Sequence, residues 1–329
     1  MQRIPHGQQK NFSYGLITLG IVFFFVSAIL LVLFLQPPQR TWKFQSIDTM
    51  KHSRDLARQQ LSQTNPTTID VEVKQIAETG ATHVAIATPY DEEFLPVLRQ
   101  WVVAARKNNL KVWLRGNFSG WEGWFDYPKI TRDEHLQKTM DFLQKNSALF
   151  EDGDIFTACP ECENGGPGDP RITRDVKGHR EFLVKEYQQT RDFFKSIGKN
   201  VATNYDSMNY DVAKLIMDKE TTSRLGGVVT IDHYVKSPEK INSDINSLAE
   251  SSNGEIVLGE FGAPVPDITG NMSEVEQQEW VQKVLQTLSQ NPNVTGVNYW
   301  VDWGGSTALW NQDGTPRAAV SIIKKYYTL

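Results

Sequence analysis

Two glutamates of this chain lie in stretches whose composition favours chemistry. Glu161 lies in "DIFTACPECENGGPGDP", between the two cysteines of the chain, and Glu260 lies in "IVLGEFGAP", after an apolar run and between two glycines. Paired carboxyl groups can act as a proton donor and a nucleophile, or as an acid and a base. The CxxC pattern around Glu161 is instead typical of redox and metal sites. The elements that position these residues decide between the two kinds of chemistry.

The pair Cys159 and Cys162 is a weak signal for redox or metal chemistry. A redox CxxC normally opens a helix, which lowers the thiol pKa, whereas "ENGGPGDP" after Cys162 predicts a loop. A zinc site needs about four ligands, and His233 with a carboxylate would have to complete it. We expect no metal and no cofactor. The two cysteines form a disulfide if the body is extracellular, or free thiols if it faces the cytoplasm.

The chain after residue 41 alternates between β-branched or aromatic runs and amphipathic stretches. Strands alternating with helices predict a parallel sheet, and eight such units predict closure into a barrel. The first run continues into "SIDTMKHSRDLAR", which lacks the glycine-rich phosphate loop of an open doubly wound sheet. The sequence therefore predicts an α/β fold, a single TIM barrel over residues 42–329. Its strands are predicted at residues 43–48, 83–88, 111–116, 154–159, 200–205, 227–232, 255–260 and 296–301.

The last long helical pattern, residues 273–290, opens with a recognisable start signal. In "MSEVEQQEW", the hydroxyl of Ser273 can accept a hydrogen bond from the first turn while the carboxylate of Glu276 reaches back. This spacing predicts a capping box.

Functional side chains of such a barrel lie where each strand ends and its loop begins. Polar and aromatic residues occur at all eight predicted points, so we expect them to gather at one mouth. They are Asp48; Tyr90 and Asp91; Arg115 and Asn117; Glu161, Glu163 and Asn164; Asn204, Tyr205 and Asp206; Asp232, His233 and Tyr234; Glu260; and Trp300, Asp302 and Trp303. Apart from Tyr90, Asp91, Asp206, Asp302 and the two catalytic candidates, all are predicted to contact a substrate.

Glu161 and Glu260 end the fourth and seventh predicted strands, which lie across the barrel from each other. Cleavage of a glycosidic bond needs one carboxyl group to protonate the leaving oxygen and a second to attack the anomeric carbon or to activate water. Opposite strands of an eight-stranded barrel can place two carboxyl groups about 5 Å apart, the spacing of a retaining mechanism. We therefore predict catalytic roles for both glutamates.

At these positions residues 42–329 resemble the clan of retaining β-glycoside hydrolases built on a (β/α)8 barrel, of the cellulase, mannanase and galactanase type. The resemblance rests on Glu161, Glu260, Trp300, the "DHY" of residues 232–234 and the ending "ALWNQDGTPRAAVSIIKKYY". It implies that Glu260 attacks the anomeric carbon and that Glu161 serves first as acid and then as base. It also implies that Tyr234 hydrogen-bonds Glu260 and that Trp300 stacks under the sugar.

The chain departs from that clan at Pro160, where the clan usually has an asparagine that hydrogen-bonds the sugar 2-hydroxyl. Either Asn164 or Asn204 supplies this contact, or Glu163 is the acid/base residue, or the site no longer hydrolyses a substrate. We favour Glu161 over Glu163 because Glu161 directly follows the predicted strand.

The loop "NFSGWEGWFDY" after the third predicted strand carries Trp121 and Trp124. Exposed indoles are costly without a ligand, and flat aromatic faces suit the apolar faces of sugars, so we expect both to bind carbohydrate. The alternative is that the loop folds onto itself and buries them. Arg115 either binds a sugar hydroxyl or an acidic group, or pairs with a strand-end carboxylate.

Residues 15–35, "GLITLGIVFFFVSAILLVLFL", carry no charge. The run is about 20 residues long, which is enough to cross a bilayer as a helix. A cleavable signal peptide normally has a shorter apolar region and a small-residue cleavage site, and neither is found here. We expect a short tail over residues 1–14, a transmembrane anchor over 15–35 and a linker over 36–41. Basic residues flank the run on both sides, so the orientation signal is weak. We expect the body outside the cytoplasm, with a cytoplasmic body as the alternative.

Composition limits the partners of the chain. A net charge of −5 without a basic cluster disfavours nucleic acid, so we expect a carbohydrate substrate and the lipid bilayer as partners. The oligomeric state is not specified by any pattern. The leading hypothesis is a membrane-anchored retaining β-glycosidase. The rival hypotheses are a catalytically inactive glycan-binding barrel and a transglycosylase that remodels cell-surface glycan.

Overall fold

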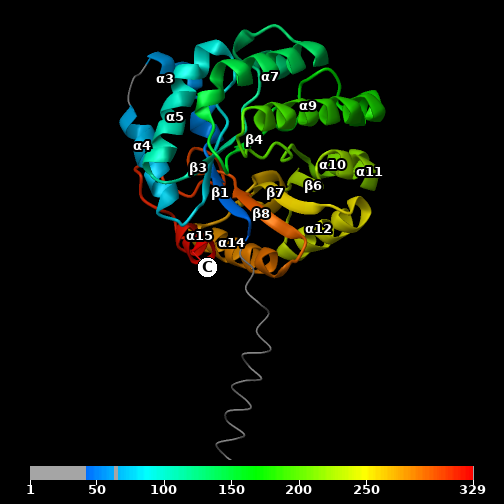
Figure 1. Ribbon diagram of the computed structural model, residues 1–329. Coiled ribbons are helices and arrows are strands. Elements are labelled where there is room, and N and C mark those ends of the chain that lie inside the picture. Colours follow the sequence, from blue (N-terminus) through cyan, green and yellow to red (C-terminus); the bar gives the residue numbers. More distant parts are fainter. Residues whose placement is uncertain (1–41, 63–65, 329) are drawn as a thin grey trace, which may run out of the picture. The chain divides into compact units, whose positions relative to one another are not determined.

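Eight parallel strands form the centre of the domain, in the order β4-β3-β2-β1-β8-β7-β6-β5 (Figure 1). The computed structural model describes residues 42–62 and 66–328. β1 pairs with β8, and a parallel bridge between Ile155 and Ala202 links β4 to the segment that leads into β5. The predicted α/β barrel is therefore confirmed. Its strands are β1 (Phe44–Asp48), β2 (His83–Ile86), β3 (Lys111–Leu114), β4 (Ile155–Phe156), β5 (Ser207–Asn209), β6 (Val228–Asp232), β7 (Glu255–Phe261) and β8 (Val294–Tyr299).

Helices surround the strands, as Figure 1 shows, and bury apolar faces against them. The predicted capping box is confirmed at the start of α14, where Ser273 accepts from the Glu276 amide and Glu276 accepts from the Ser273 amide. The outer helices are α4 (Pro66–Ala77), α5 (Leu95–Lys107), α7 (Arg132–Asn146), α9 (Val176–Ser196), α10 (Tyr210–Ile216), α11 (Lys219–Arg224), α12 (Pro238–Ser252), α14 (Glu274–Gln290) and α15 (Ala319–Tyr327).

Short helices lie in the connections between the strands and the outer helices. They are α2 (Met50–Ser53), α3 (Ala57–Ser62), α6 (Ser119–Glu122), α8 (Pro170–Thr173) and α13 (Pro266–Thr269), with the 3-10 turns η1 (Glu92–Phe94), η2 (Trp124–Asp126) and η3 (Ser147–Leu149). Except for η3, which leads from α7 into β4, they follow strands and so lie at the carboxyl ends, where the candidate site is found.

An aromatic cluster fills the barrel near the amino ends of the strands. Phe44, the first residue of β1, packs edge-to-face on Trp113 and Tyr205 with ring centroids 5.4 and 5.2 Å away. Gly296 makes this approach possible, because a Cβ there would lie 2.4 Å from the Phe44 ring. The cluster closes this end of the barrel, so that polar chemistry is confined to the opposite end.

The fifth strand lies later in the chain than the sequence predicts. Residues 200–205 have the β-branched run, but the paired strand is Ser207–Asn209, whose partners in β6 are Thr230 to Asp232. A polar segment occupies the strand because the barrel interior at this level is itself polar. The residues at the mouth are therefore those that follow residue 206.

No helix in the described parts of the chain is long and apolar enough to cross a membrane. The predicted anchor over residues 15–35 lies outside those parts, as do the tail over 1–14 and the linker over 36–41.

Candidate functional site

Arg115, just after β3, is the centre of the polar layer and is 1% exposed. Its Nη1 donates to Asp48 Oδ2 at 2.5 Å and to Glu260 Oε1 at 3.2 Å. Its Nη2 donates to Ser207 Oγ at 2.9 Å and to Asp232 Oδ2 at 3.2 Å. One guanidinium thus joins the carboxyl ends of β1, β6 and β7 with the first residue of β5. Of the two roles predicted for Arg115, pairing with strand-end carboxylates is the one that the geometry shows.

Asp48 belongs to the same layer and is fully buried. Asn298 Nδ2 donates to Asp48 Oδ2 at 3.0 Å, and the Met50 amide donates to Oδ1 at 2.7 Å. These contacts occupy both carboxylate oxygens. The predicted substrate contact of Asp48 is therefore wrong, because its carboxylate bonds to Arg115 and to the amide at the start of α2.

Glu260 lies near the end of β7 and is 5% exposed. Oε1 accepts from Arg115, and Oε2 accepts from the Tyr234 hydroxyl at 2.8 Å, the contact that the sequence resemblance implies. Burial raises the pKa of Glu260 to about 8, and the Glu161 carboxyl adds to this, while Arg115 and the Tyr234 hydrogen bond lower it. Both oxygens are thus held by donors that favour the ionised form.

Glu161 lies across the mouth from Glu260 and is partly exposed. It does not directly follow the strand as predicted, because β4 ends at Phe156 and residues 157–160 lie between them. One carboxylate oxygen from each of Glu161, Asp232 and Glu260 lies within 4.8 Å of the other two. Burial raises the pKa of Glu161 and the Glu163 carboxyl adds to this effect. The three carboxyl groups face one another around a single guanidinium, so they cannot all be ionised without strong repulsion.

The backbone at Glu161 is left-handed, with φ of +45°. A non-glycine residue rarely adopts this conformation, because it costs roughly 1–2 kcal/mol. The Glu161 amide donates to Ser207 O at 2.7 Å, and its carbonyl accepts from the Asn164 amide at 2.7 Å. Cys159 and Cys162, which flank it, are joined by a disulfide and are buried. Of the two predicted states of the cysteines, the structure has the disulfide.

Trp121 supports this loop from below. It is 1% exposed, stacks on Phe182 with centroids 5.2 Å apart, and donates from Nε1 to Cys162 O at 3.1 Å. Gly166 presses on the indole, where a Cβ would come within 2.0 Å. The predicted carbohydrate contact of Trp121 is wrong, and the loop folds onto itself as the alternative held. Trp124 is partly exposed.

Asn117 is also buried beneath the loop. Its Oδ1 accepts from the Phe118 amide at 2.7 Å and lies 2.9 Å from His135 Nε2, and its Nδ2 lies 3.8 Å from Cys159 Sγ. The side chain is fully buried, so the predicted substrate contact is wrong here as well. Asn117 holds the disulfide and α7 together.

Glu163 faces the end of β5 rather than the carboxyl cluster. Its Oε1 accepts from the Asn209 amide at 2.7 Å and from Asn209 Nδ2 at 2.9 Å, and it is 1% exposed. Glu163 is therefore not placed to contact a substrate. Asn164 is partly exposed, and a hydrogen bond from its side chain lowers the pKa of Glu161.

Asn204 and Tyr205 lie before β5, on the side of the barrel away from the mouth. Asn204 Nδ2 donates to Gly226 O at 3.2 Å, ahead of β6, and Tyr205 packs in the aromatic cluster around Phe44. Their predicted substrate contacts are wrong because the strand begins later than the β-branched run. Asn209, which sequence reasoning missed, ends β5; the polar run "SMNYD" was the available signal.

The three side chains of the "DHY" triplet at the end of β6 lie in three different environments. Asp232 binds Arg115, and burial raises its pKa well above the ordinary range. His233 Nε2 lies 2.8 Å from Asp244 Oδ2 in α12 and its ring stacks on Tyr210, so it faces away from the cluster. Tyr234 alone reaches Glu260. His233 is buried and paired with Asp244, so its predicted substrate contact is wrong. The Asp232 carboxylate lies within 4.8 Å of those of Glu161 and Glu260, and its contact with substrate stays a prediction.

Two partly exposed tryptophans follow β8. The Trp300 ring meets Tyr234 edge-on with centroids 5.8 Å apart, which places it beside Glu260. Trp303 lies with its ring centroid 5.8 Å from that of His52. Trp300 and Trp303 remain candidates for a sugar platform.

The connections after β1 and β3 bring further charged residues that sequence reasoning missed. Burial raises the pKa of Glu122 to about 8, the Arg54 cation lowers it, and the Glu161 carboxyl raises it. Arg54 also lowers the pKa of Glu161, so both residues lie close to the acid/base candidate. Glu122 ends the short helix α6 and Arg54 follows the short helix α2, and neither helix is long enough for periodicity to mark a functional position.

The carboxyl cluster does not fit a metal ion well. Carboxylates suit hard cations, but Arg115 already lies within 3.2 Å of both Glu260 and Asp232 and supplies the positive charge. Cys159 and Cys162 come near Glu186 but are joined to each other, so their sulfurs are not free thiolates.

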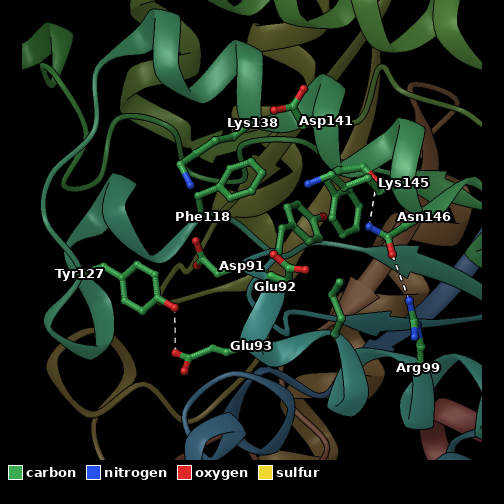
Figure 2. A pocket seen from close by; sticks show the side chains of 13 residues that line it. Asp91, Glu92, Glu93, Arg99, Phe118, Tyr127, Lys138, Asp141, Lys145 and Asn146 are labelled. Atoms are coloured by element: carbon green, nitrogen blue, oxygen red, sulfur yellow. Dashed lines mark hydrogen bonds between the residues drawn. The ribbon is translucent and has the colours of Figure 1, made fainter.

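A hollow of about 440 Å³ lies between the connection after β2 and helix α7 (Figure 2). It contains neither Glu161 nor Glu260. Figure 2 shows the Tyr127 hydroxyl bonded to Glu93 at one side, and charges of both signs stand around the hollow. It is separate from the carboxyl cluster, and its mixed charges specify no ligand class.

Replacing Arg115 by Met should lower the free energy of unfolding at pH 8 by about 3–5 kcal/mol, because it leaves buried carboxylates without their cation. The pKa values of Asp232 and Glu260 in the folded variant then rise further above their unfolded values. The folded state binds more protons, so the loss should shrink as the pH falls to 5. Denaturant titrations at both pH values measure it.

The matched control is Arg191→Met, on the exposed surface of α9, where the guanidinium pairs with Asp192. We expect a change within about 0.5 kcal/mol for this control. An equal loss at pH 5 and pH 8 in Arg115→Met would contradict an electrostatic origin.

Comparison with known proteins identifies the fold. No family model matches the sequence, and no curated protein matches it significantly. Among solved structures, a fungal β-1,4-galactanase is 12% identical with a TM-score of 0.57, covering 87% of this chain and 100% of its own. A GH5_18 protein from Streptomyces cattleya, in complex with Manβ1-4GlcNAc, is 13% identical with a TM-score of 0.66, covering 87% and 80%. Its counterpart from Bifidobacterium longum subsp. longum is 16% identical with a TM-score of 0.63, covering 88% and 78%. The chain therefore has the (β/α)8 barrel fold found in these β-glycoside hydrolase structures.

Proposed function

We propose that this protein is a retaining β-glycosidase that acts on an oligo- or polysaccharide. The observation that carries the proposal is the approach of carboxylate oxygens of Glu161 and Glu260 to within 4.8 Å at the barrel mouth. Retaining enzymes need carboxyl groups about 5–5.5 Å apart, whereas inverting enzymes need about 6.5–9.5 Å to leave room for water. The fold shared with glycoside hydrolases supports the same reading.

The surroundings of the two glutamates assign their roles. Burial raises the pKa of Glu260 to about 8, and the hydrogen bonds from Arg115 and Tyr234 oppose this shift and stabilise the ionised form that a nucleophile requires. Glu161 is partly exposed, and burial together with Glu163 raises its pKa, as an acid catalyst requires. Two carboxyl groups with different environments thus divide the roles of acid and nucleophile.

The reaction then has two steps. A Glu260 oxygen bonds to the anomeric carbon while the bond from that carbon to the leaving oxygen breaks, and Glu161 gives its proton to this oxygen. In the second step Glu161, now ionised, takes a proton from water. The water oxygen bonds to the anomeric carbon as the ester bond to Glu260 breaks.

Only a few of the predicted sugar-binding side chains lie near the two glutamates. Trp300, beside Tyr234, offers a ring on which the sugar next to the cleaved bond stacks. Asn164, beside Glu161, supplies the sugar 2-hydroxyl contact in place of the asparagine that Pro160 replaces. Asn204 does not serve, since it lies on the far side of the barrel. The other substrate contacts that we propose are Trp124 and Trp303.

We further propose that residues 15–35 anchor the protein in a membrane with the barrel outside the cytoplasm. The Cys159–Cys162 disulfide supports this orientation, because disulfides persist in oxidising compartments and are rare in the cytosol.

Incubation of the full-length protein with a panel of β-linked polysaccharides tests the activity. Glu260→Ala and Glu161→Ala should each lower turnover by about 10²–10⁴-fold or more, because each removes one partner of the two-step reaction. The control Glu250→Gln, at an exposed position of α12, should retain turnover within about tenfold, since this carboxyl lies outside the cluster.

Analysis of the products separates the rival functions. Transfer of sugar to an added acceptor in preference to water would mark a transglycosylase. Binding without turnover would mark an inactive barrel. Turnover that survives in both Glu260→Ala and Glu161→Ala would rule out the assigned residues.

Tyr234→Phe should move the acid limb of the pH profile of kcat/KM upward by about one unit. The Tyr234 hydrogen bond lowers the pKa of Glu260, so its loss raises that pKa. The nucleophile must be ionised, so activity falls as the pH drops through this pKa. Tyr326→Phe, in α15, is the matched control. If the acid limb does not move, the Tyr234 hydrogen bond does not set the pKa of the nucleophile, and the prediction is wrong.

Membrane fractionation tests the anchor and its orientation. The full-length protein should stay in the pellet after alkaline carbonate extraction, and its barrel should be digested when protease is added to intact cells. Release by carbonate would contradict the anchor, and protection of the barrel would place it in the cytoplasm.

A further inference from the structure

Three cations of the segment that follows β1 each lie over an aromatic ring of the barrel mouth. The segment is residues 51–58, and the rings belong to the connections after β8 and β3. Such contacts hold the charged group over the ring without using its hydrogen-bond donors. The pairs are Lys51 Nζ at 5.7 Å from the centroid of Trp300, Arg54 at 4.7 Å from Trp124, and Arg58 at 4.9 Å from Phe125. We call Lys51, Arg54 and Arg58 the cation row.

The three cations of the row have one carboxylate in close contact, and four others, Glu93, Asp126, Glu122 and Glu161, lie on neighbouring connections. Asp55 is the only carboxylate within the segment, and it bonds both Lys51, at 2.9 Å, and Arg54, at 2.8 Å. Arg58 comes no nearer than 3.6 Å to Glu93 and 3.9 Å to Asp126. Surface pairs at such distances contribute little. Nη2 of Arg58 donates to Phe125 O at 2.7 Å, so the other nitrogens of this guanidinium keep donors for another anion.

The polar ends of the cation row reach solvent. The side chains of Lys51, Arg54 and Arg58 are 31%, 21% and 47% exposed. Their aromatic partners keep them from swinging freely, which lowers the entropy that binding must overcome. These cations are thus arranged before any ligand arrives.

The row passes directly beside the proposed catalytic pair. Lys51 lies over Trp300, which meets Tyr234, the residue bonded to Glu260. Arg54 lies close enough to Glu161 to lower its pKa. A glycan bound across the two glutamates would therefore pass the cations on one side.

We propose that the cation row binds anionic substituents of the substrate, so that the enzyme prefers an acidic β-linked glycan to its neutral counterpart. The inference rests on the proposed function of the same site and names its substrate class. The guanidinium fork of Arg54 and of Arg58 matches the two oxygens of a carboxylate or a sulfate, and Lys51 adds a point charge.

Binding to the full-length Glu260→Gln variant tests the substrate class independently of turnover. The probes are matched pairs: cellohexaose with its C6-oxidised cellouronate and its 6-O-sulfate, and mannohexaose with oligomannuronate. Calorimetry should show an acidic member binding about tenfold or more tightly than its neutral partner, with a preference that falls as salt is raised. The carboxylate and sulfate arms show which anion the row accepts.

Adding Arg54→Gln and Arg58→Gln together should abolish the preference, so that the acidic and neutral members bind with equal affinity, because the change removes the two guanidinium charges that attract the anion. Lys51→Gln, made separately, should also lower the preference for the acidic member. Arg191→Gln on α9 is the control and should leave this preference unchanged. Thermal unfolding confirms that each variant is folded.

Equal or weaker binding of every acidic member, including the case in which no probe binds, overturns the proposal, as does a preference that survives in the double variant. Failure of the proposed function looks different: the unmodified enzyme would turn over neither kind of glycan, while acidic probes would still bind through the cation row.

Discussion

The site depends on one buried guanidinium in the middle of a barrel. Arg115 binds Asp48, Asp232 and Glu260 from three strands, and each of these carboxyl groups would be costly to bury alone. The same contact orients Glu260, since it fixes one oxygen while Tyr234 fixes the other. The contacts of Arg115 therefore both stabilise the fold and orient Glu260. A substitution in this polar layer is expected to affect both.

Charge imbalance in this layer gives the carboxyl groups different properties. Glu161, Asp232 and Glu260 share one close cation, so burial and mutual repulsion raise their pKa values. Hydrogen-bond donors concentrate on Glu260, while Glu161 faces outward. An acid and a nucleophile can thus coexist at one pH, because the environment rather than the residue type separates them.

The loop after β4 solves a different problem, which is to hold Glu161 in a left-handed conformation. The disulfide closes around Pro160 and Glu161, Trp121 supports the Cys162 carbonyl, and Gly166 lets the loop lie flat on the indole. This loop accounts for Pro160, which stands where the clan that the sequence resembles usually has an asparagine. It belongs to a covalently closed turn, whose rigidity offsets the local strain.

Sequence patterns alone were enough to predict the barrel, the place of Glu260 near the end of the seventh strand and the capping box at Ser273, because periodicity and short-range spacing are local properties. Glu161 was expected directly after the fourth strand, but β4 ends at Phe156, and Glu161 lies in the loop that the disulfide closes. Which strand-end residues face the mouth was decided by tertiary structure alone. Four side chains of types that suit a sugar-binding site instead bond to a partner from another segment of the chain. They are Asp48, Asn117, Trp121 and His233. Asn204 and Tyr205 were misplaced because pairing with β6, and not β-branching, sets where β5 begins. Burial and pairing are long-range properties, so no spacing along one chain could have revealed them.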